Sequence, residues 1–398
     1  MRGRLHLFTP RSSGAPRGPG PARRFLWPAL AAICALTIAG QIAYAIAPHV
    51  EDMARLLGGG RALLSGEPPG RLLAIYPPSS VVQYLPLAML PVGVAEFLTR
   101  LATACILVWM VASFGRDDDG RIEPWSLVLL VSPPAINAVR LDQFNAALAL
   151  LALIVAWHLL RSGRPLLAGL VAGIAATRPF TAIPVGLGLI GAAGRGQRVR
   201  LLAGGTAFVG MTLAAAFVWD PNLFRDIVST SEHRSLVGPV GFVRTEFGIV
   251  GVCVWLGLVG LLCMTLSNGF RDRPRDAFVV VLAVSTFAVH LGGPYVAIFA
   301  LPAVARLAAT VSPWWAVATT LGYASLVTVA SPLTSAWALH GDVVFALVMA
   351  PLAFAAAATW LVYQRRRLPE RALTLAPYPL LASASEDSRF ALGDGVVA

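Results

Sequence analysis

The chain has 398 residues, of which 57% are hydrophobic and only 13% are charged. Soluble domains carry about 25% charged residues, so this composition excludes a water-soluble enzyme and indicates a polytopic membrane protein. The net charge of +11 comes from 31 basic residues, all arginine and spread between apolar blocks, which argues against a nucleic-acid-binding domain.

Apolar blocks of near membrane-spanning length follow one another along most of the chain. The first, residues 25–47, is longer than a signal-peptide core and predicts an uncleaved first helix, with cleavage near Ala45 as the alternative. Together the blocks predict an all-α bundle of about 10–12 transmembrane helices. The other blocks are residues 91–114, 124–139, 143–160, 165–178, 179–194, 201–219, 247–266, 277–293, 294–310, 313–331 and 342–363.

Proline and arginine placement indicate how these blocks are arranged. The short neighbours 165–178 and 179–194 meet at a proline, which indicates helices that stop inside the membrane. Both termini are predicted to be cytoplasmic, because 22 of the 31 arginines then lie on that side. We expect a disordered basic cytoplasmic tail over 1–24, a transmembrane domain over 25–363 and a disordered cytoplasmic tail over 364–398.

Two predicted extracytoplasmic loops, residues 48–80 and 220–246, exceed simple turns, and such loops are usually functional. In the first, leucines recur at helical spacing after Asp52, which predicts an amphipathic helix at the membrane interface. Asp52 in its first turn is either a charge favoured by the helix dipole or a catalytic carboxylate. The run Tyr76-Pro77-Pro78 then enters the next block through a kink, where the tyrosine is suited to interfacial anchoring.

Polar residues collect at two interruptions of the apolar sequence. In residues 142–145, the amides of Gln143 and Asn145 are suited to a sugar or a phosphate, or else to capping a helix. Arg178 lies at the proline break, where burial of an arginine requires an anionic partner. That partner is either an acid of the protein or a bound phosphate, and we favour phosphate.

Three polar residues at the predicted outer side are further candidates for binding substrate: His233, Arg234 and His290. A lone histidine in such a position is more often structural than catalytic. The four cysteines lie inside apolar blocks, and no HExxH motif or Cys/His metal-binding spacing occurs. We therefore expect neither a metal nor a cofactor.

Taken in order, these motifs resemble those of glycosyltransferase family 87, the polyprenol-phosphate-mannose-dependent mannosyltransferases of the GT-C superfamily. That family shows an Asp after the first helix and then Ala-Leu-Leu-x-Gly; here Asp52 precedes Ala-Leu-Leu-Ser-Gly at 62–66. Its Tyr-x-Pro entry is similar to Tyr76-Pro77-Pro78. Its Gly-Gln-x-Asn run is similar to residues 142–145, with Asp for Gly, and its Lys-Pro is similar to Arg178-Pro179.

The likeness covers about residues 25–310. Two later motifs depart from the family: an Asn-Gln-Ser run corresponds to His233-Arg234-Ser235, and a Ser-Trp-x-His segment is reduced to His290-Leu291-Gly292-Gly293. The absence of lysine and the abundance of Ala, Gly, Leu, Val and Pro are typical of a GC-rich bacterial genome.

The resemblance implies a GT-C-type bundle in a bacterial cytoplasmic membrane, with extracytoplasmic loops carrying the active site. The implied reaction moves a hexose, mannose in the family, from a polyprenyl-monophosphate sugar to a lipid or glycan acceptor by inverting single displacement. Asp52 would be the general base and Arg178 would hold the donor phosphate. The remaining candidates would bind substrate: Tyr76, Gln143, Asn145, His233, Arg234 and His290.

Two other classes of protein remain open from the sequence. One is a polytopic transporter or a lipid or glycolipid flippase of similar helix count, and the other is a non-catalytic scaffold for envelope assembly. A transporter would be favoured by paired broken helices in both halves of the chain. The breaks lie mainly near 178–179 and 293–294, which is too little to establish a repeat.

Overall fold

The structure is a computed structural model, and its described residues are helical with no named β-strand. Contacts divide the chain into Met1–Ala355 and Ala356–Ala398, and every described residue belongs to the first unit. The all-α polytopic membrane fold predicted from composition is confirmed. The described residues are 21–43, 51–67, 78–116, 120–222, 239–269, 274–289 and 294–310, with Val317, Thr320 and Tyr323.

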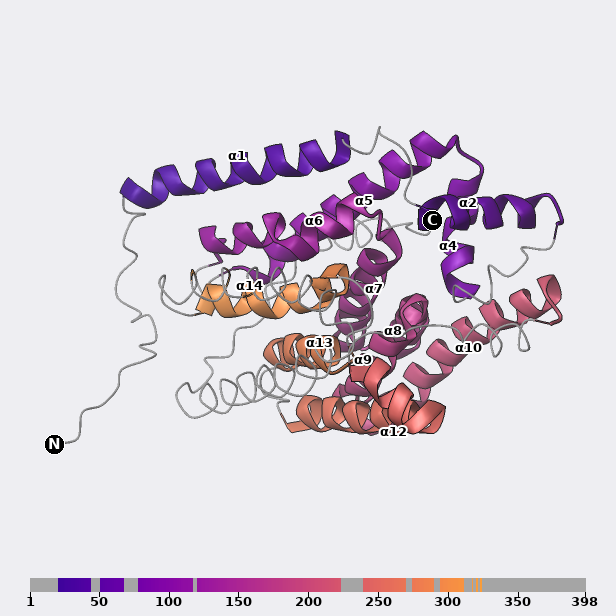
Figure 1. The fold of residues 1–398 in the computed structure, drawn as a ribbon. Coiled ribbons are helices and arrows are strands. Elements are labelled where there is room, and N and C mark those ends of the chain that lie inside the picture. Colours follow the sequence, from indigo (N-terminus) through magenta and orange to yellow (C-terminus); the bar gives the residue numbers. More distant parts are fainter. Residues whose placement is uncertain are drawn as a thin grey trace, which may run out of the picture. The chain divides into compact units, whose positions relative to one another are not determined.

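Figure 1 labels the α-helices, and the 3₁₀ helices are called η in the text. Those described are α1 (Pro21–Ala43), α2 (Glu51–Leu64), α4 (Pro78–Ala88), α5 (Val92–Phe114), η2 (Pro124–Val131), α6 (Pro133–Arg140), α7 (Phe144–Arg161), α8 (Pro165–Ile174), η3 (Ala175–Thr177), α9 (Pro179–Ala192), α10 (Arg195–Trp219), α12 (Pro239–Gly269), α13 (Pro274–Val289), η4 (Pro294–Ala300) and α14 (Leu301–Thr310).

Four of these helices are long and apolar enough to cross a membrane: α5, α7, α10 and the Val243–Gly269 part of α12. The predicted blocks at 313–331 and 342–363 and the tail at 364–398 lie outside the described residues, apart from three positions in the first block. The GT-C-type arrangement and the count of about 10–12 spans therefore stay predictions.

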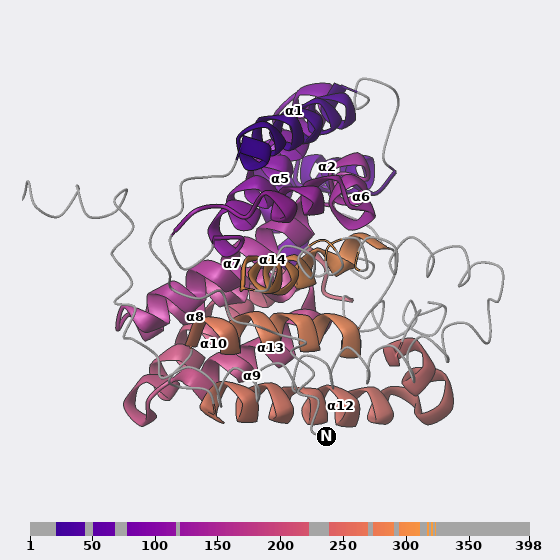
Figure 2. The same cartoon turned by 90° about the vertical axis from the view of Figure 1, so that its left-hand side faces the viewer.

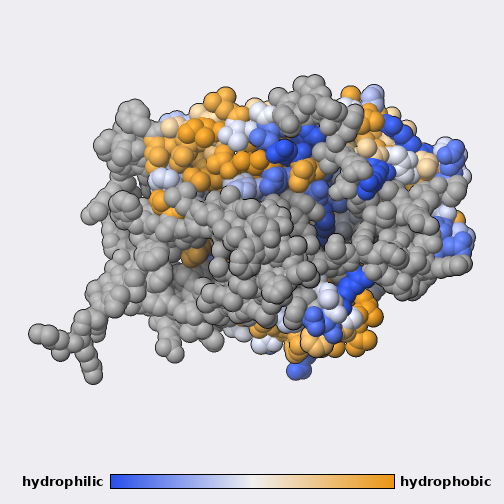
Figure 3. Space-filling model, in the orientation of Figure 1, coloured by the Kyte–Doolittle hydropathy of each residue, from blue (hydrophilic) through white to orange (hydrophobic). Residues whose placement is uncertain are grey.

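Helix α5 has the distribution of side chains that a bilayer favours. Its buried face carries polar residues, and its exposed face carries large apolar ones such as Phe97, Leu98 and Trp109. In water this arrangement would be costly, whereas in lipid the apolar face is solvated and the polar face is shielded by protein. Exposed apolar side chains also lie on α1 and α12, and orange surface is visible over both in Figure 3.

The predicted break between residues 165–178 and 179–194 is confirmed. Helix α8 passes into the 3₁₀ turn η3, and α9 begins at Pro179. Proline suits the first helical position because it has no N–H to donate, and it disfavours a helical conformation at the residue before it, here Arg178 with φ −125° and ψ 68°. The single block expected at 124–139 is instead the 3₁₀ helix η2 followed by α6, because Pro133 and Pro134 begin a new helix there.

Glycine contacts bring α8 against α10. A Cβ added at Gly169 would meet the carbonyl oxygen of Leu201, and one at Gly204 would meet the carbonyl oxygen of Leu166. Helices pack this closely in membranes where small residues let the backbones approach. Helix α9 packs in turn against α12, which lies beside α9 and α13 in both Figures 1 and 2. These contacts fix the two helices that flank Arg178.

Helix α12 begins at Pro239, inside the stretch predicted to be the second loop. Gly248, at φ 65° and ψ −164°, interrupts the helical backbone. Glycine adopts this positive φ at little steric cost, so a short helical segment precedes the long apolar one. Residues 223–238 of that loop lie outside the described residues.

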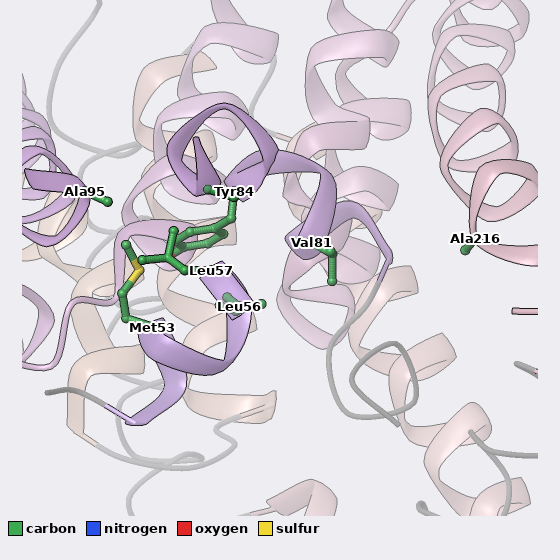
Figure 4. Packing of buried hydrophobic residues seen from close by; sticks show 8 residues of the cluster. Met53, Leu56, Leu57, Val81, Tyr84, Ala95 and Ala216 are labelled. Atoms are coloured by element: carbon green, nitrogen blue, oxygen red, sulfur yellow. The ribbon is translucent and has the colours of Figure 1, made fainter. Parts of the chain in front are cut away.

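The amphipathic helix expected after the first apolar block is confirmed as α2. Its buried stripe consists of Met53, Leu56 and Leu57, at the spacing of one helical face. These side chains pack with Val81 and Tyr84 of α4, and Figure 4 shows Met53 and Leu57 beside the Tyr84 ring. The sequence predicted only a kinked entry where the structure has α4.

Arg61 fastens α2 to the C-terminal end of α4. Its Nε donates to the carbonyl oxygen of Ala88 at 3.1 Å, and its Nη2 donates to that of Leu90 at 2.9 Å. The last carbonyl groups of a helix lack partners within the helix, so a guanidinium stabilises them through hydrogen bonds and through the helix dipole. Helices α2 and α4 thus form one packed unit.

Candidate functional site

The site begins with the turn that ends α6. The N–H of Asp142 donates to the carbonyl oxygen of Val139 at 3.2 Å, and that of Gln143 donates to Ala138 at 2.8 Å. This pair of bonds is a Schellman motif, whose penultimate residue adopts a left-handed conformation. Asp142 does so, with φ 50°. Glycine adopts a positive φ most easily, and aspartate tolerates it better than most residues. This explains why Asp can occupy a position at which the family that the sequence resembles has Gly.

The turn delivers two amides to Arg178. Nη2 of Arg178 donates to Oε1 of Gln143 at 2.6 Å and to Oδ1 of Asn145 at 2.9 Å. Gln143 and Asn145 are only 5% and 6% exposed. We call these three residues the Arg178 clamp. It joins the start of α7 to the break before α9, so the two polar interruptions singled out in the sequence meet in space.

The amides orient the guanidinium rather than cap α7. Gln143 occupies the N-cap position, but its side chain makes no cap hydrogen bond. Its Nε2 donates at 3.3 Å to the carbonyl oxygen of Leu141 in its own turn, while its oxygen accepts from Arg178. Both amide oxygens are neutral acceptors, and they orient the guanidinium through hydrogen bonds. Such a group is suited to bind an anion.

Helix α4 contacts both halves of the Arg178 clamp through neighbouring residues. Nε2 of Gln83 donates at 3.2 Å to the carbonyl oxygen of Ile174, at the end of α8. The ring of Tyr84 meets the ring of Phe144 edge-on, with centroids 6.1 Å apart. Phe144 lies between the two clamp amides in sequence. Sequence reasoning did not single out Gln83, although a glutamine among the mostly apolar residues 81–90 is a signal worth noting.

Four further polar residues are buried beside the clamp, on α5 and the α6–α7 turn: Glu96, Thr99, Arg100 and Asp142. Each is at most 4% exposed, and Oγ1 of Thr99 donates to Oδ2 of Asp142 at 2.9 Å. Burial raises the pKa of the Asp142 carboxyl to about 7, against the lowering effects of the Thr99 hydrogen bond and the Arg100 charge. The sequence reasoning had not connected these α5 residues with the site.

The structure describes only part of the predicted substrate site. Asp52 lies in the first turn of α2, next to the buried Met53, but its side chain is outside what the structure describes. Tyr76, His233, Arg234 and His290 also lie outside the described residues. Their predicted roles stay predictions. Among the described residues, no group of three His, Cys, Asp or Glu side chains is placed to hold a metal ion.

A second polar group lies at the other end of α5. Nη2 of Arg275 donates to the carbonyl oxygen of Ser113, and Nε of Arg306 contacts Oδ1 of Asp276 at 3.2 Å. Ser113 is fourteen residues beyond Thr99, which corresponds to about 20 Å along a helix. Helix α5 therefore runs between two polar groups, one of which contains the Asp142–Thr99 contact.

Four apolar helices of spanning length, with buried polar contacts that join α5, the α6–α7 turn and Arg178, define a membrane protein. The family model of glycosyltransferase family 87 matches residues 74–332, more than half of the chain, and the chain belongs to this family. The protein is therefore a membrane glycosyltransferase, as the resemblance implied. The match contains all of the Arg178 clamp and begins after α2. No curated protein and no solved structure matches the chain.

Proposed function

We propose that the protein transfers a hexose, in the first instance mannose, from a polyprenyl-monophosphate sugar to a lipid or glycan acceptor. The observation that carries this proposal is the Arg178 clamp, a guanidinium oriented by two buried amides at the junction of two short helices. A guanidinium that is held in one orientation by two amides can bind a phosphate through its positive charge and through charge-assisted hydrogen bonds. A phosphate-bearing lipid donor is suited to such a group at membrane depth.

In the proposed reaction, the acceptor hydroxyl oxygen attacks the anomeric carbon as the bond to the lipid phosphate breaks. The phosphate leaves with the electron pair of that bond, and the hydroxyl proton passes to a general base. Arg178 binds the leaving phosphate and stabilises its developing charge. Asp52 is the proposed base. A single displacement of this kind inverts the anomeric centre and needs no covalent enzyme intermediate.

Asp52→Asn tests this mechanism, with Glu51→Gln as the matched control. Adjacent helical residues point about 100° apart, so only one of these two carboxylates can face a common substrate. Loss of general-base catalysis should lower kcat about 10²–10⁴-fold in Asp52→Asn, with much less effect in the control. The assay is transfer from radiolabelled polyprenyl-phosphate mannose to a membrane extract. Normal turnover by Asp52→Asn, or a larger loss in the control, contradicts the mechanism.

The active site is proposed to face the outside of a bacterial cytoplasmic membrane. Arginine placement predicts which residues lie on the outer side, and residues of that group meet around Arg178. Residues predicted on the cytoplasmic side meet around Arg275 and Arg306. The two groups stay separate, which supports this orientation. A membrane-impermeant thiol reagent should label Gly70→Cys but not Pro10→Cys in intact cells, in a background without the four native cysteines. The reverse pattern would overturn the orientation.

A further inference from the structure

The hydroxyl of Thr99 lies near more acceptors than it has protons. Its Oγ1 is 2.9 Å from the carbonyl oxygen of Ala95, 3.0 Å from that of Glu96, and 2.9 Å from Oδ2 of Asp142. A hydroxyl has one proton to donate and two lone pairs that accept. If Asp142 is ionised, Thr99 must give its proton to the carboxylate, and neither carbonyl contact is then a full hydrogen bond.

A proton on Asp142 resolves this shortage. The acid then donates from Oδ2 to Oγ1 of Thr99, and Thr99 donates its own proton to the carbonyl oxygen of Ala95. The other carboxyl oxygen, Oδ1, is buried and has no hydrogen-bond partner among the described residues. An ionised carboxylate with so few donors is costly to bury, whereas the neutral acid is not.

We propose that Asp142 is a positioning residue which, as a neutral acid, ties the α6–α7 turn to α5 through Thr99 and so holds Gln143 against Arg178. The inference rests on the proposed function, because it treats the Arg178 clamp as the donor-phosphate site. Ionisation of Asp142 places in this turn a buried negative charge whose Oδ1 has no hydrogen-bond donor among the described residues. The turn then relaxes, and Arg178 loses the oxygen that orients it.

The charged neighbours agree with this assignment. Glu96 of α5 raises the pKa of Asp142 and Arg100 of the same helix lowers it, but burial has the largest effect and brings the pKa to about 7. Arg140 on α6 and Arg178 before α9 lie on the elements that flank the turn. The protonated form predominates below this pKa, so the clamp is fully formed at lower pH and is lost as the pH rises through about 7.

The expected effect on donor binding follows from the fraction of neutral Asp142. That fraction falls from about nine-tenths near pH 6 to about one-tenth near pH 8, and apparent affinity falls in proportion, by about tenfold. The experiment measures binding of farnesyl phosphate, a short polyprenyl monophosphate, to the purified full-length protein. Asp142→Asn is the matched variant, since its amide donates to Thr99 without titrating. At each pH, the affinity of the wild type is divided by that of Asp142→Asn. This ratio removes the titration of the phosphate itself, which affects both proteins alike.

Asp142→Gly provides a second variant that fits the positive φ but has no link to Thr99. It should bind more weakly than the wild type near pH 6 and without the additional pH dependence. Between pH 6 and pH 8, the affinity of Asp142→Asn should change only as far as the titration of the phosphate itself requires. If wild type and Asp142→Asn lose affinity equally as the pH rises, the positioning role is wrong.

Infrared spectroscopy tests the protonation without any donor. The carbonyl stretch of a protonated carboxylic acid should be present in the wild type near pH 6, fade towards pH 8 and be missing from Asp142→Asn. A wild type without this band overturns the inference, whatever the binding result. A different result is a band that titrates while the protein binds no farnesyl phosphate at either pH. That result overturns the proposed function, and with it the link to donor binding.

Discussion

Gln143→Ala should weaken binding of a lipid phosphate while leaving the helices in place. The substitution removes the oxygen that accepts from Nη2 of Arg178 at 2.6 Å and leaves the 2.9 Å contact to Asn145. A hydrogen bond to a charged group contributes about 1.5–3 kcal/mol, and each 1.4 kcal/mol is a factor of ten in affinity. We therefore expect farnesyl phosphate to bind about 10- to 100-fold more weakly.

A double-mutant cycle with Arg178→Gln shows whether this loss acts through the guanidinium. If Gln143 serves only to orient Arg178, its removal should have little further effect once the guanidinium is gone. Arg178→Lys should retain partial affinity, because it keeps the charge and loses the planar fork. Gln197→Ala is the matched control, since that amide accepts from the N–H of Gly194 at the start of α10. Independent, additive losses from the two clamp substitutions would refute the reasoning.

Two predictions concern stability. Tyr84→Ala removes a side chain only 1% exposed that packs on Phe144, and should lower the free energy of unfolding by about 3–5 kcal/mol; an unchanged denaturation midpoint in detergent would contradict this packing. Gly169→Ala should cost about 1–3 kcal/mol, because its Cβ meets the α10 backbone, whereas Gly210→Ala, with open space around its Cβ, should be neutral. Equal thermal stabilities of the two glycine variants would argue against the close α8–α10 contact.

Local signals in the sequence predicted much of the helical framework. The bounds expected for the blocks at 91–114 and 143–160 lie within one residue of α5 and α7, since long apolar runs form helices without help from distant residues. The leucine spacing after Asp52 predicted α2, because apolar residues that recur on one helical face are also a local pattern. Pro179 marked the break before α9, because a proline disfavours the helical conformation at the residue before it, and Arg178 has φ −125° and ψ 68°.

The parts that sequence reasoning missed depend on distant neighbours. Pro77 and Pro78 indicated a kinked entry, yet Pro78 is the first residue of α4, which extends to Ala88 with Pro86 in its last turn. Asp142 was noted only as a departure from glycine, and the positive φ that accounts for it is a backbone property. The burial of Arg100 beside Asp142 likewise arises only when α5 packs against the α6–α7 turn.

The position of α4 gives a physical reason why a short, proline-flanked helix should matter to the reaction. One face of α4 packs on the α2 stripe that follows Asp52, and Gln83 and Tyr84 contact the two segments that form the Arg178 clamp. In a single displacement, the base and the leaving phosphate must hold fixed positions on opposite sides of one carbon atom. Misplacement by about 1 Å can cost 10²-fold in rate. Under the proposed mechanism, the spacing between base and phosphate is therefore set by the packing of α4, whose own residues need not touch the substrate.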